Sequence, residues 1–215
     1  MTVGMASMFL LVFFVVYGPI VACDHYFVKD TDNTSCIIMD SNITGVLHYT
    51  KSDNSTEQFK FNISGRGDGS CKGTQHIYIS FNSPVGLKNS TLAIHFKQKD
   101  DSFLISNFTL AVYFEQKLNS TESLHMYLMD KHAELDVSAS SNGAYKCSET
   151  ILSFEGGSAV TLHNVRLTAY AHFNTTEFPE NQVAVTEYNI CQLDVRTSDL
   201  VPIVVGVCLA ALVII

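Results

Sequence analysis

NFTLAVYF, residues 107–114, is the stretch that indicates the fold class most clearly. Phenylalanine, leucine, valine and phenylalanine occupy every second position from 108 to 114, and small or polar residues lie between them. Successive side chains on a β-strand point to opposite faces of the sheet, so one face of this segment is apolar. The stretch therefore predicts a half-buried strand with Asn107 on its water-facing side.

The same period of two recurs along the chain. It is present in residues 59–63, 77–81, 92–96, 135–137 and 165–173. Turn-forming residues separate these runs, in segments 65–69, 83–84, 99–102, 140–143, 156–157 and 178–181. The best helical candidate, residues 122–136, is only weakly periodic. Many short half-buried strands joined by turns are typical of antiparallel sheet proteins, so we predict an all-β fold with a single antiparallel β-sheet domain.

Charge divides the chain into three segments. All 13 basic and 21 acidic side chains lie between Asp24 and Asp199, and the formal net charge is −8. An acidic balance of this size argues against nucleic-acid binding. Two uncharged, apolar ends on a polar middle also argue against a cytosolic enzyme.

The N-terminal end has the pattern of a secretory signal peptide. Residues 8–16 (MFLLVFFVV) are apolar, Gly18 and Pro19 break the run, and small residues follow at 21–23. Cleavage after Cys23 or after Ala22 is compatible with this pattern. We predict a signal peptide over residues 1–23.

The C-terminal end, residues 200–215 (LVPIVVGVCLAALVII), contains no charged residue. As a helix it would span about 24 Å, which is less than the roughly 30 Å hydrocarbon core of a bilayer. It is either part of a transmembrane helix or a cleaved lipid-anchor signal, and the anchor signal would need a longer polar spacer before it. We predict an apparently truncated transmembrane helix over residues 200–215.

Eight Asn-x-Ser/Thr triplets lie between the two apolar ends. Their asparagines are Asn33, Asn42, Asn54, Asn62, Asn89, Asn107, Asn119 and Asn174. Behind a signal peptide such triplets accept N-linked glycans, so the polar middle is predicted to be heavily glycosylated. Strand parity places Asn62, like Asn107, on a water-facing side. The alternative is a polar surface that carries few sugars.

Four cysteines remain once Cys23, at the cleavage point, and Cys208, in the apolar tail, are set aside. They are Cys36, Cys71, Cys147 and Cys191. An even set in a secretory context predicts two disulfides, for which three connectivities are possible. Sequential pairing would close one loop near each end of the domain, and each bond would stabilise the fold by at most about 4 kcal/mol.

Sequence patterns of catalysis are missing. The chain contains no GxSxG, HExxH or phosphate-binding loop, and no cysteine or histidine spacing typical of metal sites. We predict no catalytic residue, no metal and no cofactor.

Two further features allow more than one interpretation. Arg66-Gly67-Asp68, between two glycines, is either an exposed adhesion loop or a solvated turn. Eight histidines lie in the polar middle and would mostly be protonated near pH 5, which allows pH sensing, although scattered surface histidines explain them equally simply.

Several stretches resemble the lysosome-associated membrane glycoprotein (LAMP) family, which includes macrosialin. Residues 26–30 (YFVKD) and 34–40 (TSCIIMD) resemble the opening of a family luminal domain, and residues 145–147 (YKC) and 165–170 (VRLTAY) resemble later parts of it. The most specific similarity is Cys191-Gln192-Leu193-Asp194 followed by residues 200–206 (LVPIVVG).

The resemblance implies a β-prism-like luminal domain with the sequential disulfides Cys36–Cys71 and Cys147–Cys191. It also implies residence in late endosomal or lysosomal membranes, where sugars shield the protein and the bilayer from hydrolases. This address follows from the resemblance and not from a sorting signal within the 215 residues.

Three segments are therefore expected: a signal peptide over 1–23, a glycosylated luminal β domain over 24–199 and a membrane helix over 200–215. The expected function is that of a non-enzymatic type I membrane glycoprotein that protects the lysosomal or late endosomal membrane. The alternative is a receptor or adhesion glycoprotein of the plasma membrane. The expected partners are the membrane, crossed once, and N-linked glycans, without nucleic acid.

Overall fold

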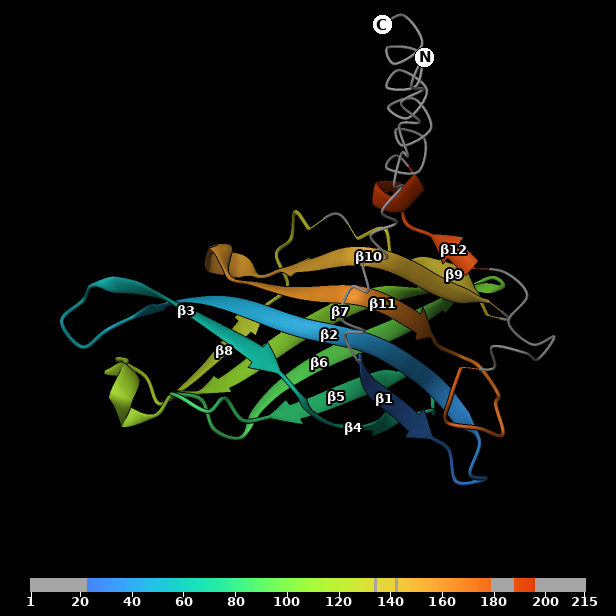
Figure 1. The fold of residues 1–215 in the computed structure, drawn as a ribbon, viewed down its shortest axis with the longest axis horizontal. Helices are drawn as coiled ribbons and strands as arrows, with labels where there is room; N and C mark the ends of the chain where they lie inside the picture. The colour runs from blue at the N-terminus through green and yellow to red at the C-terminus, as the bar shows by residue number, and fades with distance from the viewer. Residues whose placement is uncertain (1–22, 134, 142, 179–187, 196–215) are drawn as a thin grey trace, which may run out of the picture.

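Twelve strands in two sheets form the part of the chain that the computed structural model describes, residues 23–133, 135–141, 143–178 and 188–195 (Figure 1). The all-β expectation is confirmed. Within these residues no helix has both the length and the apolar character needed to cross a bilayer. The membrane helix predicted for residues 200–215 and the signal peptide predicted for 1–23, apart from Cys23, lie outside the described residues.

The first sheet is built around β2, a strand of 16 residues. One edge of β2 pairs with β1 through its first half and with β3 through its second half. The other edge pairs with β11, which is followed by β10 and β12. Every pair is antiparallel except β10 with β12, so the predicted antiparallel sheet has one parallel edge. The bounds are β1 Asp24–Lys29, β2 Ser35–Thr50, β3 Thr56–Ile63, β10 Ala144–Ser153, β11 Ala159–Thr168 and β12 Tyr188–Ile190.

The second sheet is antiparallel throughout and has the strand order β4-β5-β6-β7-β8, with β9 also paired to β7. Its bounds are β4 Gly65–Ser70, β5 His76–Phe81, β6 Ser90–Lys99, β7 Ser102–Tyr113, β8 Leu124–Leu128 and β9 Ser138–Ser140. Two short 3-10 helices, η1 (Gln116–Leu118) and η2 (Glu155–Gly157), lie in connections.

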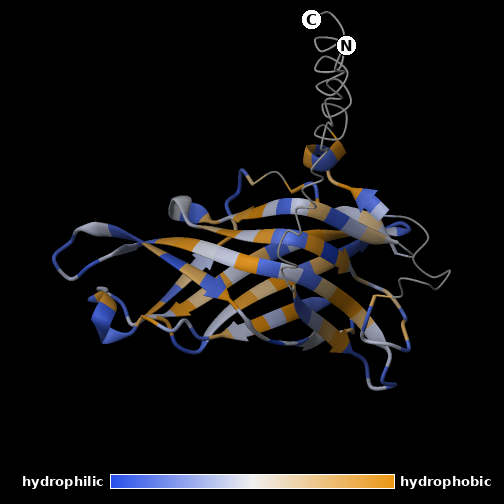
Figure 2. Ribbon diagram, viewed as in Figure 1, coloured by the Kyte–Doolittle hydropathy of each residue, from blue (hydrophilic) through white to orange (hydrophobic). Residues whose placement is uncertain are grey.

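The inner faces of the two sheets enclose the main hydrophobic core. Figure 1 shows the strands of one sheet crossing those of the other at an angle, and Figure 2 shows hydrophobic and hydrophilic residues alternating along them. Phe108 of β7 is fully buried and meets the ring of Phe154 edge-on at a centroid distance of 5.1 Å. The period of two in the sequence thus corresponds to a core between two sheets.

A smaller cluster lies on the outer face of the first sheet. The segment 169–178 folds back over β2, and Phe173 exchanges backbone hydrogen bonds of 2.7 and 3.1 Å with Ser35. Phe173 and Phe178 then pack with Ile38, whose two neighbours on β2 point to the main core. This segment covers apolar side chains that would otherwise face water.

Four predicted strands are confirmed and two are wrong in extent or position. Residues 59–63, 77–81 and 92–96 lie in β3, β5 and β6, and the predicted strand 107–114 lies in β7 except for Phe114, which forms an isolated bridge with Leu87. The run 135–137 is not a strand, and β9 begins just after it. The run 165–173 does not form one strand either, because β11 ends at Thr168 and Tyr170 adopts a left-handed backbone with φ 58°.

The turn predicted at residues 65–69 is also wrong, since these residues belong to β4. The glycines permit close pairing with β5: a Cβ atom at Gly65 would clash with the carbonyl oxygen of Ser80, and one at Gly69 with that of His76. Glycine is enriched in turns, but it also occurs where backbones approach closely. Here the second role applies.

Candidate functional surface

Four of the eight predicted glycosylation asparagines lie in turns or connections with a left-handed backbone. The φ angles are 63° at Asn33, 64° at Asn54, 49° at Asn89 and 49° at Asn119. Asparagine tolerates this conformation better than most residues because its short polar side chain bonds locally. All four side chains are exposed, so their amides are presented where the chain reverses direction.

The other four lie on strands or on the segment after β11. Asn62 of β3 and Asn107 of β7 are exposed while Phe61, Ile63 and Phe108 beside them are buried, as strand parity predicts. Asn174 is exposed, and Asn42 of β2 is half-buried. Both sheets and several turns therefore present acceptor asparagines to solvent; whether they carry sugars stays a prediction.

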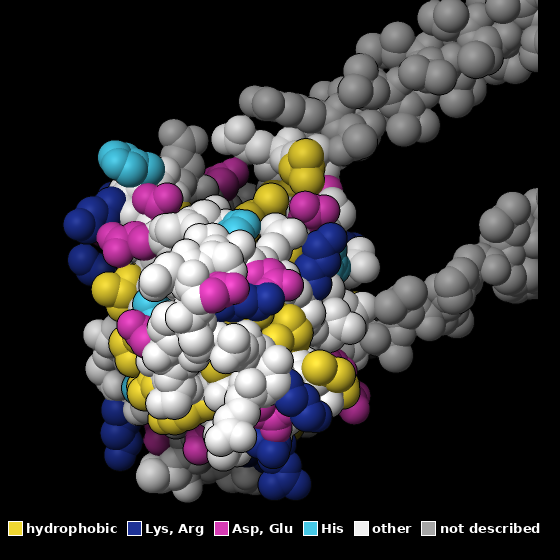
Figure 3. All heavy atoms as spheres, turned by 90° about the vertical axis from the view of Figure 1, so that its left-hand side faces the viewer, with side chains coloured by type: hydrophobic (Ala, Val, Ile, Leu, Met, Phe, Trp, Pro, Cys, Tyr) yellow, Lys and Arg dark blue, Asp and Glu magenta, His cyan; other side chains and the backbone are white. Residues whose placement is uncertain are grey.

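Two turn asparagines use their side-chain oxygen in hydrogen bonds. Lys29 Nζ donates to Asn33 Oδ1 at 2.9 Å, and Ser52 Oγ donates to Asn119 Oδ1 at 3.1 Å. N-linked glycans are attached to the amide nitrogen, which these bonds do not involve. Ser52 N–H also donates to the Asn119 carbonyl at 2.9 Å, which brings the Asn119 connection to the β2–β3 turn that holds Asn54. Figure 3 looks onto this end of the molecule, where polar and charged side chains cover much of the surface.

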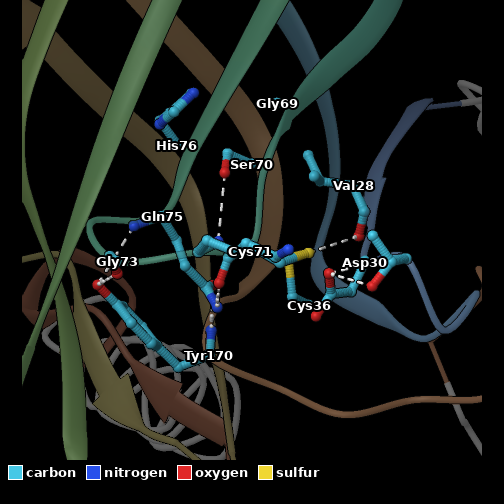
Figure 4. Close-up of a disulfide and its surroundings, with 12 residues drawn as sticks. Val28, Asp30, Cys36, Gly69, Ser70, Cys71, Gly73, Gln75, His76 and Tyr170 are labelled. Atoms are coloured by element: carbon cyan, nitrogen blue, oxygen red, sulfur yellow. Dashed lines mark hydrogen bonds between the residues drawn. A yellow bond between two sulfur atoms is a disulfide. The ribbon is translucent and has the colours of Figure 1, made fainter.

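The first disulfide, Cys36–Cys71, joins β2 of the first sheet to the residue after β4 of the second, with a Cα–Cα distance of 5.7 Å (Figure 4). Gln75, only 4% exposed, lies beside it. The Gln75 amide donates to the Cys71 carbonyl at 3.3 Å and accepts from Tyr170 N–H at 2.7 Å. Tyr170 OH in turn donates to the Phe96 carbonyl at 3.1 Å. Covalent and hydrogen bonds therefore connect the two sheets at this point.

The second disulfide, Cys147–Cys191, joins β10 to the residue after β12, with a Cα–Cα distance of 5.3 Å. A helical turn over residues 192–195 follows, and Asp194 accepts hydrogen bonds from Ser148 N–H at 2.8 Å and from the Ser148 hydroxyl. Cys147, Cys191 and Asp194 lie close enough to suggest a metal site, but the two sulfurs are bonded to each other and cannot act as thiolates. The sequential pairing implied by the family resemblance is thus present at both bonds.

Histidines are distributed over separate parts of the surface. His25 Nδ1 lies 2.6 Å from Asp40 Oδ1, and Arg166 donates to the other oxygen of Asp40 at 2.7 Å. His125 Nδ1 lies 2.7 Å from Glu122 Oε2.

His95 lies beside another histidine and not beside a carboxylate. It faces His76 directly across β5 and β6, with ring centroids 5.4 Å apart. Burial, and to a lesser extent the nearby His76, lowers the pKa of His95. On acidification the unfolded chain therefore binds this proton before the folded chain does. The stabilising contribution of neutral His95 is present above the unfolded pKa, about 6.5, and is lost as the pH falls below it.

The Arg66-Gly67-Asp68 segment differs from the loop that an adhesion role would assume. Arg66 and Asp68 pair with Ser80 and Tyr78 of β5 and are both exposed. Residues two apart on a strand share a face, so both side chains project on one side of β4. Asp68 also accepts a hydrogen bond from Gly69 N–H at 2.7 Å. This extended geometry replaces the flexible turn that the glycines suggested.

Two contacts near the disulfides were not predicted from the sequence. The pattern of residues 165–173 places Tyr170 in a strand, whereas its backbone leaves the strand to meet Gln75. The Ser148–Asp194 contact joins residues 46 positions apart. No local pattern could indicate either contact, since both depend on how distant segments meet.

Comparison with solved structures adds to this geometry. The membrane-proximal domain of mouse lysosome-associated membrane protein 1 (LAMP-1) matches with a TM-score of 0.61 and 19% identity, covering 80% of this chain and 98% of that one. Human LAMP-3 matches with a TM-score of 0.55 and 20% identity, covering 80% and 100%. The membrane-distal domain of mouse LAMP-2 matches with a TM-score of 0.57 and 10% identity, covering 78% and 98%.

The chain has a LAMP-like fold. At these identities the similarity concerns the fold alone. No protein-family model matches the sequence, and no curated protein matches it either. The resemblance noted in the sequence, which rested most on the cysteine frame and on residues 191–194 and 200–206, implied this fold, and the two sequential disulfides agree with it; residues 200–206 lie outside the described residues.

Proposed function

We propose that this chain is a type I membrane glycoprotein of the lysosomal or late endosomal membrane, and that its glycan-covered luminal domain protects that membrane. The observation that carries the proposal is the presentation of the acceptor asparagines: seven are exposed and one is half-buried on a LAMP-like fold. Its solved relatives in fold are lysosome-associated membrane proteins by name.

The proposed mechanism is steric and not catalytic. Sugars on both sheets and on the turns would keep proteases away from the strands, and the two disulfides would limit the local opening that proteolysis requires. The predicted segments 1–23 and 200–215 would direct the chain into the secretory pathway and anchor it, with residues 24–199 in the lumen.

Protease survival tests the protective role. The glycosylated protein from secretory cells is incubated with a lysosomal protease at about pH 5, before and after enzymatic removal of N-glycans under native conditions. We expect survival to fall several-fold on deglycosylation, because exposed connections become accessible. Equal survival of the two forms would contradict the proposal.

A matched pair of variants isolates one site. Thr109→Ala removes the acceptor triplet of Asn107, whereas Thr109→Ser keeps it at the same half-buried position of β7. A shift in mass for the alanine variant alone would demonstrate a glycan at Asn107. Equal masses of the two variants, after correction for the substituted residues, would show that Asn107 carries no glycan.

Localisation distinguishes the alternative, a plasma-membrane receptor or adhesion glycoprotein. The full chain is expressed with an internal tag, labelled by surface biotinylation and compared with markers of acidic compartments. Mainly intracellular protein in acidic compartments supports the proposal, and mainly biotinylated protein supports the alternative.

A further inference from the structure

Four exposed apolar side chains lie close together in sequence at the end of the described chain. Tyr188 and Ile190 of β12 are 39% and 51% exposed, and Leu193 and Val195 of the following helical turn are 55% and 47% exposed. We call these four residues the base patch. Figure 1 shows β12 and the helical turn next to each other at one end of the molecule, and Figure 2 shows hydrophobic positions in both.

The base patch is held in place from two sides. Tyr188 and Ile190 pair in parallel with Ala144 and Lys146 of β10, and Cys191 between the two parts is bonded to Cys147. Asp194 accepts two hydrogen bonds from Ser148. The exposed apolar side chains are therefore presented by an ordered scaffold, so that a partner surface would not have to order them on binding.

Lys146 and Tyr188 are residue types that suit a membrane interface. Lys146 Nζ lies 5.8 Å from the centroid of the Tyr188 ring. Tyrosine is enriched at the headgroup level of bilayers, and lysine can extend its charge towards phosphates while its methylene groups stay on apolar neighbours. Aliphatic side chains such as Ile190 and Leu193 can enter the boundary between headgroups and acyl chains.

The length of chain beyond the patch limits its distance from the bilayer. Five residue steps separate Val195 from Leu200, where the predicted membrane helix begins. An extended chain covers at most about 3.5 Å per residue, which gives a maximum of roughly 17 Å. Because the headgroup layer is itself about 5–8 Å thick, Val195 can lie only about 10 Å above it at most.

We propose that the base patch rests on the phospholipid surface of the membrane in which the chain is anchored, with Tyr188 and Ile190 at headgroup depth. This inference rests on the membrane anchor of the proposed function and adds the orientation of the domain on the bilayer. The edge of the second sheet formed by β4 and β5 then faces away from the membrane, since Figure 1 shows these two strands on the side opposite to β12.

The lack of tryptophan in the sequence makes a direct test possible. The full chain carrying Ile190→Trp is reconstituted into phosphatidylcholine vesicles with or without bromine on the upper acyl chain, because bromine quenches nearby indole fluorescence. We expect an about twofold loss of fluorescence in brominated vesicles, since an indole at this position would lie at headgroup depth. Tyr78→Trp, at a 38% exposed position of β5, is the matched control and should not be quenched.

A second variant tests whether the apolar contact is responsible. Leu193→Asp added to Ile190→Trp should abolish the quenching, whereas Met126→Asp, at a 56% exposed position of β8, should leave it unchanged. Thermal unfolding of each variant checks that the domain stays folded.

The outcomes separate the two proposals. Protein that resists alkaline carbonate extraction but shows no quenching with Ile190→Trp would overturn the docking and leave the anchor intact. Protein released by carbonate would overturn the anchor and the docking with it. Quenching that requires a high protein density in the vesicles would assign the patch to a second copy of the chain and would also overturn the docking.

Discussion

The two disulfides close loops of similar length but join different kinds of structure. Cys36 and Cys71 are 35 residues apart and connect the two sheets, beside the buried Gln75. Cys147 and Cys191 are 44 residues apart and connect β10 to the three-residue edge strand β12 of the same sheet. Loop length alone predicts nearly equal stabilisation. Both bonds touch the main core, but the first joins the two sheets whereas the second holds one short edge strand, so we expect different effects on stability.

Removal of the bonds should have the largest effect. We expect Cys36→Ala with Cys71→Ala to lower the free energy of unfolding by about 4 kcal/mol. The bond restricts the unfolded chain, and it joins the two sheets that enclose the core. For Cys147→Ala with Cys191→Ala we expect less than about half of that, because β12 can detach locally and recover entropy in the native state.

Denaturant unfolding of both double variants measures this difference. Hydrogen exchange should show new exchange over residues 188–195 in the second variant only. Equal losses of stability, or a larger loss for the second bond, would refute the view that the first bond holds the two sheets together and the second holds only a short edge strand.

Polar contacts near each bond should have intermediate effects. Gln75→Ala leaves Tyr170 N–H without its acceptor in a buried site, so we expect a loss of about 2 kcal/mol. Asp194→Ala removes the contacts to Ser148 at the surface, where water replaces them, so we expect a loss of about 1 kcal/mol or less. Thermal unfolding checks both, with Gln192→Ala, exposed on the same helical turn, as the control. A larger loss for Asp194→Ala would contradict the comparison.

The smallest effect concerns pH. Since the pKa of His95 is lowered in the folded state, acidification from about pH 7 to pH 5 should destabilise the protein through this residue. His95→Gln should therefore make the melting temperature less dependent on pH in this range. His132→Gln, at an exposed turn position, is the control substitution. A steeper dependence in His95→Gln would show that the direction of the pKa shift is wrong.

Short-range patterns account for the predictions that are confirmed. The alternation in residues 107–113 and 77–81 indicates both the strands and the faces that they bury, because parity is a property of each strand alone. The same parity correctly predicts that the side chains of Asn62 and Asn107 are exposed. Turn asparagines such as Asn33 and Asn54 were recognisable from their triplets, although their left-handed backbones were not.

Predictions failed where a distant segment decides the local conformation. The glycines at 65–69 indicate a turn, but these residues form a strand because they pair with β5. The apolar alternation through residue 173 indicates one strand, but Gln75 accepts the Tyr170 N–H beyond the end of β11. Pairing partners are long-range information that local periodicity does not contain.

By itself, the sequence determined the all-β class, the faces of the main strands, the acceptor asparagines and the four cysteines, since each follows from residue type and spacing. Only the tertiary structure decided the pairing of the two sheets, the strand at residues 65–70 and the assembly of the base patch from β12 and the helical turn. The reason is that contacts such as Cys147–Cys191 and Gln75–Tyr170 are selected by burial of the whole core, to which every strand contributes.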